Sequence, residues 1–140
     1  MDNLKQIAGP NVEFLGHVND DQYRTVLAAA RALIFPGVED FGIIPVEAQA
    51  AGTPVIALGQ GGALETVKGF NANDIPHKNG NYTGIFSQQA AVPDLIDAIR
   101  QFKKYENMFT LENCLANARK FSKDQFRTGF MQFVNRVKSK

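Results

Sequence analysis

The fold is decided by residues 44–62, which read IPVEAQAAGTPVIALGQGG. The alanine-rich first half predicts a helix over residues 43–51, with Gly52 as its C-terminal stop. Residues 54–58 form a short apolar run, which is typical of a strand buried in a parallel sheet. The glycines in 59–62 then predict a flexible turn. A helix that leads through a glycine into a buried strand is half of a β-α-β unit.

Three further apolar runs predict the rest of the sheet. Short apolar runs that alternate with helical patterns indicate parallel strands joined by crossover helices. The fold class is therefore α/β: a Rossmann-like parallel sheet of about four strands with flanking helices. We expect the second and third strands to be covered on both faces. The predicted strands are residues 12–15, 32–35, 54–58 and 84–86.

Helices are predicted between and after these strands. Asn19 or Asp20 can cap a helix that runs to about Ala30, and residues 63–67 predict a short helix before a polar loop at 68–83. The remaining predicted helices are residues 92–105, 111–120 and 123–137. In the last of these, the apolar side chains recur at helical spacing, which predicts core contacts. These side chains are Phe126, Phe130, Phe133 and Val137.

Composition indicates one ordinary globular domain over residues 1–140. The chain is 44% hydrophobic, and its 15 basic and 14 acidic residues leave a formal net charge of +1. This balance does not favour a nucleic-acid partner. There is no leader-like N-terminus and no apolar run near the ~20 residues of a membrane span, so we expect a cytoplasmic protein. The one cysteine, Cys114, has no thiol partner and is expected to serve in packing.

Candidate ligand-binding residues follow the strands, because ligands of open parallel sheets bind at the carboxyl ends of the strands. Three glycine-containing segments lie there, residues 16–18, 36–42 and 59–62, and we expect them to converge. The helix start after Gly42 offers free backbone N–H groups, which attract phosphate. Glu39 and Glu47 lie on either side of that helix start and could accept hydrogen bonds from sugar or ribose hydroxyls. Taken alone, two such glutamates are also common as helix-dipole and capping residues.

The sequence resembles glycosyltransferase family 4, whose retaining enzymes have the two Rossmann-like domains of the GT-B fold. The resemblance lies in Glu39, seven residues and Glu47, then residues 48–57 (AQAAGTPVIA) and 61–65 (GGALE). It is close from about residue 12 to residue 86, and looser in the C-terminal helices. It identifies the chain as the C-terminal, nucleotide-sugar-binding domain, truncated at its N-terminal side.

The resemblance implies a role for each candidate residue. Glu47 would hold the ribose hydroxyls of the donor, and Glu39, the implied catalytic-site residue, would contact the donor sugar without acting as a nucleophile. Backbone amides would face the sugar and diphosphate, and the residues after residue 15 would meet the base. The amides are those of Phe41, Gly42 and Ile43, the base contacts are Gly16 and Val18, and Gly61 and Gly62 would lie on the phosphate or acceptor side. The resemblance implies no metal and no cofactor.

The sequence around Glu39 and Glu47 resembles that of bacterial mannosyltransferases of surface-polysaccharide biosynthesis. It implies that the enzyme transfers a hexose to a glycan or lipid-linked acceptor. The implied hexose is mannose, carried by GDP-mannose; the alternative donor is a UDP-hexose. The full enzyme would then be cytoplasmic or peripheral to the inner membrane. Two alternatives stay open: a non-catalytic module that binds a nucleotide sugar or a partner chain, and a fragment of a GT-B-type sugar-nucleotide epimerase.

The family pattern also implies elements that residues 1–11 cannot contain. The family's C-terminal domain starts with a strand ending in Gly-Arg, then a lysine, a helix and a second strand. Without that arginine and lysine, donor binding is expected to weaken by about 10² to 10⁴, and the chain alone to have little transferase activity. The gap in the sheet would be closed by strand 12–15 moving beside strand 32–35, or an exposed strand edge would pair with another chain, for example in a homodimer.

Overall fold

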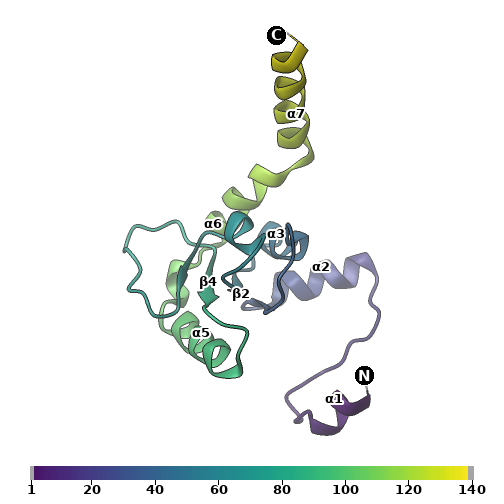
Figure 1. Cartoon of the computed structure of the whole chain (residues 1–140). Helices are drawn as coiled ribbons and strands as arrows, with labels where there is room; N and C mark the ends of the chain where they lie inside the picture. Colours follow the sequence, from purple (N-terminus) through teal and green to yellow (C-terminus); the bar gives the residue numbers. More distant parts are fainter. Residues whose placement is uncertain (1, 139–140) are drawn as a thin grey trace.

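The computed structural model describes residues 2–138 and contains one four-stranded parallel sheet, shown in Figure 1. The strands are β1 (Leu33–Phe35), β2 (Val55–Leu58), β3 (Gly69–Asn71) and β4 (Gly84–Ser87). Their order across the sheet is β1-β2-β4-β3. In the register, Ile34 pairs with Ile56 and Ile56 with Ile85. The predicted α/β fold with about four parallel strands is confirmed.

Within the described residues, the chain also contains seven α-helices and two short 3-10 helices. The α-helices are α1 (Asp2–Ile7), α2 (Asp20–Ala29), α3 (Ile43–Ala50), α4 (Ala63–Thr66), α5 (Val92–Lys104), α6 (Leu111–Ala118) and α7 (Lys123–Lys138). The 3-10 helices are η1 (Glu106–Met108) and η2 (Arg119–Phe121). Each predicted helix is present to within two residues at either end, and α1 is additional.

Helix α2 begins, and helix α3 ends, at the residues that predicted these boundaries. Asn19 and Gln22 form a reciprocal capping box at the start of α2, in which each side chain accepts a hydrogen bond from the other's backbone N–H. Gly52 follows α3 with a φ of 89°, a left-handed conformation that suits glycine at a helix end. Both signals are local in sequence, which explains why the sequence alone revealed them.

Two apolar layers form the core, one on each face of the sheet. On one face, Leu27 of α2 and Ala48 of α3 pack against Val55 and Ala57 of β2. On the other face, Ile56 and Ile85 pack against a set of helix and loop side chains that includes Phe102 of α5. The central strands β2 and β4 are buried throughout, whereas β1 is only half-buried because it lies at the edge. The expectation that residues 32–35 would be covered on both faces is wrong.

Residues 12–15, the first predicted strand, form no strand. They run as an irregular stretch between α1 and α2 that pairs with no strand and lies away from the sheet in Figure 1. Val12, Phe14 and Leu15 are 48%, 36% and 48% exposed. The stretch does not move beside β1, which leaves β1 with a free edge. The predicted closure of the sheet by this segment is wrong, because a strand needs a hydrogen-bonding partner as well as a suitable sequence.

The predicted polar loop at 68–83 contains the edge strand β3. Residues 69–71 pair in parallel with β4, and Phe70 is buried between Tyr82 and Phe109. Three residues around one aromatic side chain carry too short a pattern to predict a strand.

The last helix, α7, extends away from the rest of the molecule in Figure 1. Its predicted core residues, Phe126, Phe130, Phe133 and Val137, are 71%, 54%, 55% and 56% exposed. The prediction of core contacts is therefore wrong, although the predicted helix is present. Cys114 of α6 is fully buried, which confirms its packing role, and burial raises the pKa of its thiol to about 11. Across residues 2–138, no helix has the length and apolar character needed to cross a membrane.

Candidate functional site

Two of the three predicted ligand-binding segments meet at the start of α3. Gly42, the residue before α3, has a φ of 77°, and it brings the chain into the helix without a side-chain cap. The backbone N–H of Gly62 donates a hydrogen bond to the carbonyl of Glu39 at 2.7 Å. A methyl group on Gly62 would lie 2.4 Å from the Phe41 carbonyl, so only glycine allows this approach. The segments that follow β1 and β2 therefore form one backbone-lined edge.

This edge has the chemistry of an anion site. The first turn of α3 leaves N–H groups without intrahelical acceptors, and the positive end of the helix dipole points the same way. Phe41 and Ile43 are exposed on either side of the buried Gly42. The edge can therefore receive a phosphate or a sugar oxygen through backbone N–H groups.

Glu47 lies one turn further along α3 and faces α2. Its carboxylate accepts a hydrogen bond from the hydroxyl of Tyr23 at 2.9 Å. The two residues line a hollow of about 530 Å³ between the helices, and Asp20, Arg24 and Leu27 of α2 also line it. Only the Oε2 atom is engaged by Tyr23, which leaves Oε1 available to a hydroxyl group of a ligand.

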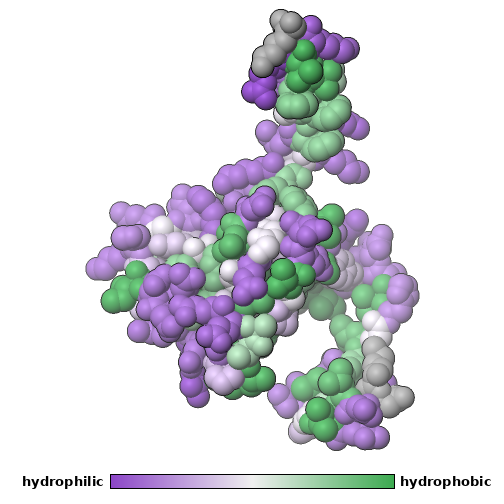
Figure 2. All heavy atoms as spheres, in the orientation of Figure 1, coloured by the Kyte–Doolittle hydropathy of each residue, from purple (hydrophilic) through white to green (hydrophobic). Residues whose placement is uncertain are grey.

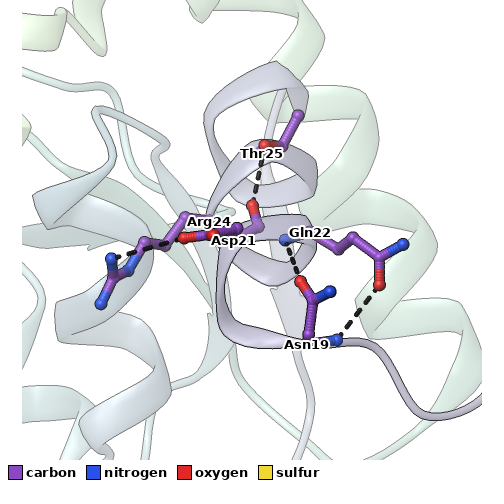
Figure 3. Close-up of polar contacts among 5 residues, drawn as sticks. All are labelled: Asn19, Asp21, Gln22, Arg24 and Thr25. Carbon is purple, nitrogen blue, oxygen red and sulfur yellow. Dashed lines mark hydrogen bonds and ion pairs between the residues drawn. The ribbon is translucent and has the colours of Figure 1, made fainter.

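Val18 lies in a second hollow at the start of α2. That hollow is lined by residues 17–21 and Arg24. Asp20 and Arg24 line both hollows, so the two adjoin. Figure 3 shows the start of α2 and the contact between Arg24 and Asp21, whose charged atoms are 3.9 Å apart. Val18 and Glu47 therefore line adjoining hollows, although Gly16 and Val18 follow no strand.

Tyr23 and Arg24 belong to this site and were not predicted. Tyr23 carried a signal, because its helical spacing with Leu27 places it on the inner face of α2. No sequence pattern indicated a role for Arg24, since a single basic residue on an exposed helix surface is common. Glu39 is exposed on its loop and lines neither hollow, and only its backbone takes part in the described contacts.

The pKa of Tyr23 gives the first testable prediction. Burial, followed by the adjacent Glu47 carboxylate, raises this pKa to about 12. Because the folded-state pKa lies above the ordinary value of about 10, the contribution to stability is complete below that value and is lost as the pH rises toward 12. We expect tyrosinate absorbance to show one late transition that disappears in Tyr23→Phe.

The Glu47→Gln variant separates the two causes of this shift. Its late transition should move down but remain above that of an ordinary tyrosine, because burial, the larger cause, persists. Circular dichroism over the same range checks that the chain stays folded. A late transition that survives Tyr23→Phe would contradict the assignment.

A buried polar network fixes α3 against α4 and α6. The Nε2 atom of Gln49 donates hydrogen bonds to the carbonyls of Pro45 and Thr66, at 2.9 and 3.0 Å. Asn117 of α6 donates to the Oε1 atom of Gln49 at 2.7 Å and to the Thr66 carbonyl at 2.9 Å. The Thr66 hydroxyl in turn donates to the carbonyl of Gly62. The network therefore connects the glycine turn of the site to the core.

An aromatic contact connects the same edge to the C-terminal region. The rings of Phe41 and Phe121 meet edge to face with centroids 5.8 Å apart. Phe121 is the last residue of η2 and is separated from α7 by Ser122 alone. Among residues 2–138, no group of three His, Cys, Asp or Glu side chains could hold a metal ion.

These features define a Rossmann-like ligand-binding domain. They are a parallel sheet flanked by helices, a glycine-rich turn packed against a helix start, and a carboxylate one turn further along that helix. The chain belongs to the family described as glycosyl transferases group 1, which it matches over residues 3–121. The predicted family resemblance is confirmed.

Individual relatives agree with this family. An uncharacterized glycosyltransferase of Methanocaldococcus jannaschii is 45% identical over 58 residues, which are 41% of this chain and 15% of the relative. The alpha-1,3/1,6-mannosyltransferase ALG2 of Eremothecium gossypii is 28% identical over 131 residues, 90% of this chain and 24% of that enzyme. The ALG2 of Rhizomucor pusillus is 47% identical over 62 residues, 44% of this chain and 14% of that enzyme. The chain thus spans a quarter or less of these relatives.

A solved structure shares the fold across nearly the whole chain. Sucrose-phosphate synthase from Thermosynechococcus elongatus superimposes with a TM-score of 0.72 at 26% sequence identity, covering 99% of this chain and 33% of that one. The match confirms the predicted GT-B type of Rossmann-like domain.

Proposed function

We propose that this chain is the donor-binding part of a retaining glycosyltransferase that transfers a hexose from a nucleotide sugar. The observation that carries the proposal is the placement of Glu47. Its carboxylate lies in a hollow beside α2, one helical turn from the amide-lined edge at the start of α3. A nucleoside diphosphate needs a hydrogen-bond acceptor for its ribose hydroxyls and N–H donors for its phosphates. This arrangement supplies both.

Each predicted residue has a role in this proposal. Glu47 holds the ribose through Oε1, while Tyr23 fixes Oε2. The amides of Phe41, Gly42 and Ile43 receive the diphosphate and sugar, and Gly61 and Gly62 leave room beside them. Val18 and Gly16 lie on the base side, and Glu39 orients a hydroxyl of the donor sugar once the sugar is bound. No metal is required, because the N–H groups and the helix dipole stabilise the diphosphate leaving group.

GDP-mannose is the proposed donor. Two observations support this donor: the segment from Glu39 to Glu47 resembles that of mannosyltransferases, and several relatives are named as mannosyltransferases. The acceptor is proposed to be a glycan or a lipid-linked sugar.

The acceptor is proposed to bind outside these 140 residues, in another part of the enzyme or in another chain. The support is that the chain covers 24% or less of the mannosyltransferases it resembles. The free edge of β1, where Ile34 is 47% exposed, is the proposed contact for that part or for a second copy. These residues alone are proposed to bind donor weakly and to transfer little sugar.

Calorimetric titration tests the proposed donor site. We expect GDP-mannose to bind the wild-type chain more tightly than UDP-glucose does. The Glu47→Gln variant should weaken binding by roughly 10- to 150-fold, because a hydrogen bond to a charged group contributes about 1.5–3 kcal/mol. Glutamine keeps the shape of Glu47 and can still accept a hydrogen bond from Tyr23.

The matched control is Glu112→Gln, which makes the same change at an exposed position on α6 and should bind like wild type. Equal affinities for wild type and Glu47→Gln would contradict the assignment of the ribose contact. Submicromolar binding by wild type would contradict the proposal that part of the donor site lies elsewhere.

A further inference from the structure

Residues 37–41, which lead from β1 toward α3, are held by few backbone contacts. They belong to no helix or strand. Among the backbone hydrogen bonds outside helices and strands in the described part of the chain, one involves this segment, from the Gly62 N–H to the Glu39 carbonyl. Gly42, which follows the segment, has a left-handed φ of 77° and no side-chain cap. A fixed position for the amides at this edge therefore depends on side-chain contacts as well.

Phe121 supplies such a contact. Its ring meets the ring of Phe41 edge to face, with centroids 5.8 Å apart and ring planes at 78°. This geometry is favourable, because the positive edge of one ring meets the negative face of the other. The contact joins the segment after β1 to the end of η2, which lies far away in the sequence.

The second segment of the edge is tied to the same part of the chain. Asn117, which lies just before Phe121, donates a hydrogen bond to the Thr66 carbonyl at 2.9 Å. The Thr66 hydroxyl donates to the carbonyl of Gly62 at 2.9 Å. The Nζ atom of Lys120 donates to the Oδ1 atom of Asn117 at 3.1 Å, so the nitrogen end of that amide is the one that faces Thr66.

Residues 117–121 therefore contact one segment of the amide-lined edge directly and the other through Thr66. We call these residues the brace. They lie where α6 continues into η2. Figure 1 shows α6 and α3 at this end of the molecule, and Figure 2 shows the same junction in space-filling form, where the chain leaves the body toward α7.

We propose that Phe121 is a positioning residue of the donor site, which holds Phe41 so that the backbone N–H groups of residues 41–43 are ordered before a ligand binds. A site that is ordered in advance loses less conformational entropy on binding. Removal of the Phe121 ring moves that cost to the binding step. The expected effect on affinity rests on the proposed function, because it assumes that a diphosphate binds at these amides. The ordering of Phe41 does not rest on it.

Nitrogen-15 relaxation of the ligand-free chain tests the ordering. We expect order parameters of about 0.85 for the amides of residues 41–43 in wild type, and of about 0.6 or less in Phe121→Leu. Phe121→Tyr keeps the ring and should keep the wild-type values. The matched control is Phe109→Leu, which removes a ring stacked on Phe102 at 5.0 Å on the other face of the sheet. It should leave the order parameters of residues 41–43 unchanged.

Titrations with GDP and with guanosine separate positioning from stability. The two ligands share the base and the ribose, but only GDP offers a diphosphate to residues 41–43. Phe121→Leu should weaken GDP binding by about two- to tenfold, the range that one aromatic pair contributes. It should leave guanosine binding unchanged, and Phe121→Tyr should restore the affinity for GDP. Glu47→Gln, by contrast, should weaken the binding of both ligands.

Unchanged order parameters at residues 41–43 in Phe121→Leu would overturn the proposal, whether or not any ligand binds. Equal weakening of GDP and guanosine binding in this variant would also overturn it, because loss of folded protein alone produces that result. If the wild-type chain binds neither ligand, the proposed donor site is wrong. The relaxation of the ligand-free chain then supports or overturns the role of Phe121 by itself.

Discussion

The Gly62→Ala variant is expected to lose roughly 1–3 kcal/mol of unfolding free energy, or more, and to lose detectable donor binding. The added methyl carbon would lie 2.4 Å from the carbonyl carbon and oxygen of Phe41, and 2.5 Å from its Cα. These are backbone atoms, so no side-chain rotation relieves the overlap. The φ and ψ of Gly62, −61° and −19°, are ordinary for alanine. The predicted cost therefore comes from this close approach rather than from backbone strain.

Displacing Phe41 would also disturb the site. The turn of Gly62 must move away from the segment before α3, which breaks the hydrogen bond from the Gly62 N–H to the Glu39 carbonyl. The amide-lined edge then loses its shape, and a diphosphate loses several hydrogen bonds together.

Gly37→Ala is the matched control for this variant. It lies on the same segment after β1, and a methyl group there would meet no atom within 4 Å. Chemical denaturation should place its stability within about 0.5 kcal/mol of wild type. If Gly62→Ala were as stable as Gly37→Ala and bound GDP-mannose equally well, the described contact between the two segments would be wrong.

The Gln49→Leu variant should destabilise the chain by roughly 1–3 kcal/mol. Gln49 is fully buried and its side chain takes part in three hydrogen bonds. Leucine has a similar size but neither donor nor acceptor, so Asn117 loses one of the two oxygens to which it donates, and the Pro45 carbonyl loses its side-chain donor. Gln88→Leu, an exposed glutamine after β4, serves as the control and should change stability by less than about 0.5 kcal/mol.

A double-mutant cycle with Asn117→Leu isolates the contact between the two side chains. Once Gln49 is leucine, removal of Asn117 should cost less than it does in wild type, with a coupling of about 0.5–3 kcal/mol. Strictly additive changes in unfolding free energy would contradict the network.

The sequence predicted well those elements whose signals are local. The capping box at Asn19, the glycine that ends α3, and the apolar runs of β2 and β4 each specify a conformation through near neighbours. The stretch 12–15 has an equally strong apolar pattern, but a strand forms only when another strand accepts its hydrogen bonds. The same reasoning explains why the apolar side chains of α7 were wrongly predicted to lie in the core. Their helical spacing determines which face of the helix is apolar, but it does not determine what covers that face.

The candidate site divides in the same way. The helix start after Gly42, the position of Glu47 on that helix and the glycine turn at 59–62 could be predicted from adjacent residues. The close approach of Gly62 to Phe41 could not, because it depends on the packing of two separate segments. The pairing of Tyr23 with Glu47 could not, since it depends on how α2 and α3 pack on the sheet, 24 residues apart in sequence. The network of Gln49, Thr66 and Asn117 joins three helices and is likewise visible only in the folded chain.

Amide chemical-shift mapping with GDP tests the central claim most directly. Two-dimensional spectra of the chain, labelled with nitrogen-15 and titrated with GDP, report every backbone N–H at once. The predicted result is a set of shifts at Phe41, Gly42 and Ile43 and beside Glu47 and Val18, which disappears in Glu47→Gln. Shifts confined to the separate hollow near Pro36, Ser87 and Leu95, or no shifts at millimolar GDP, would contradict a donor site at the start of α3.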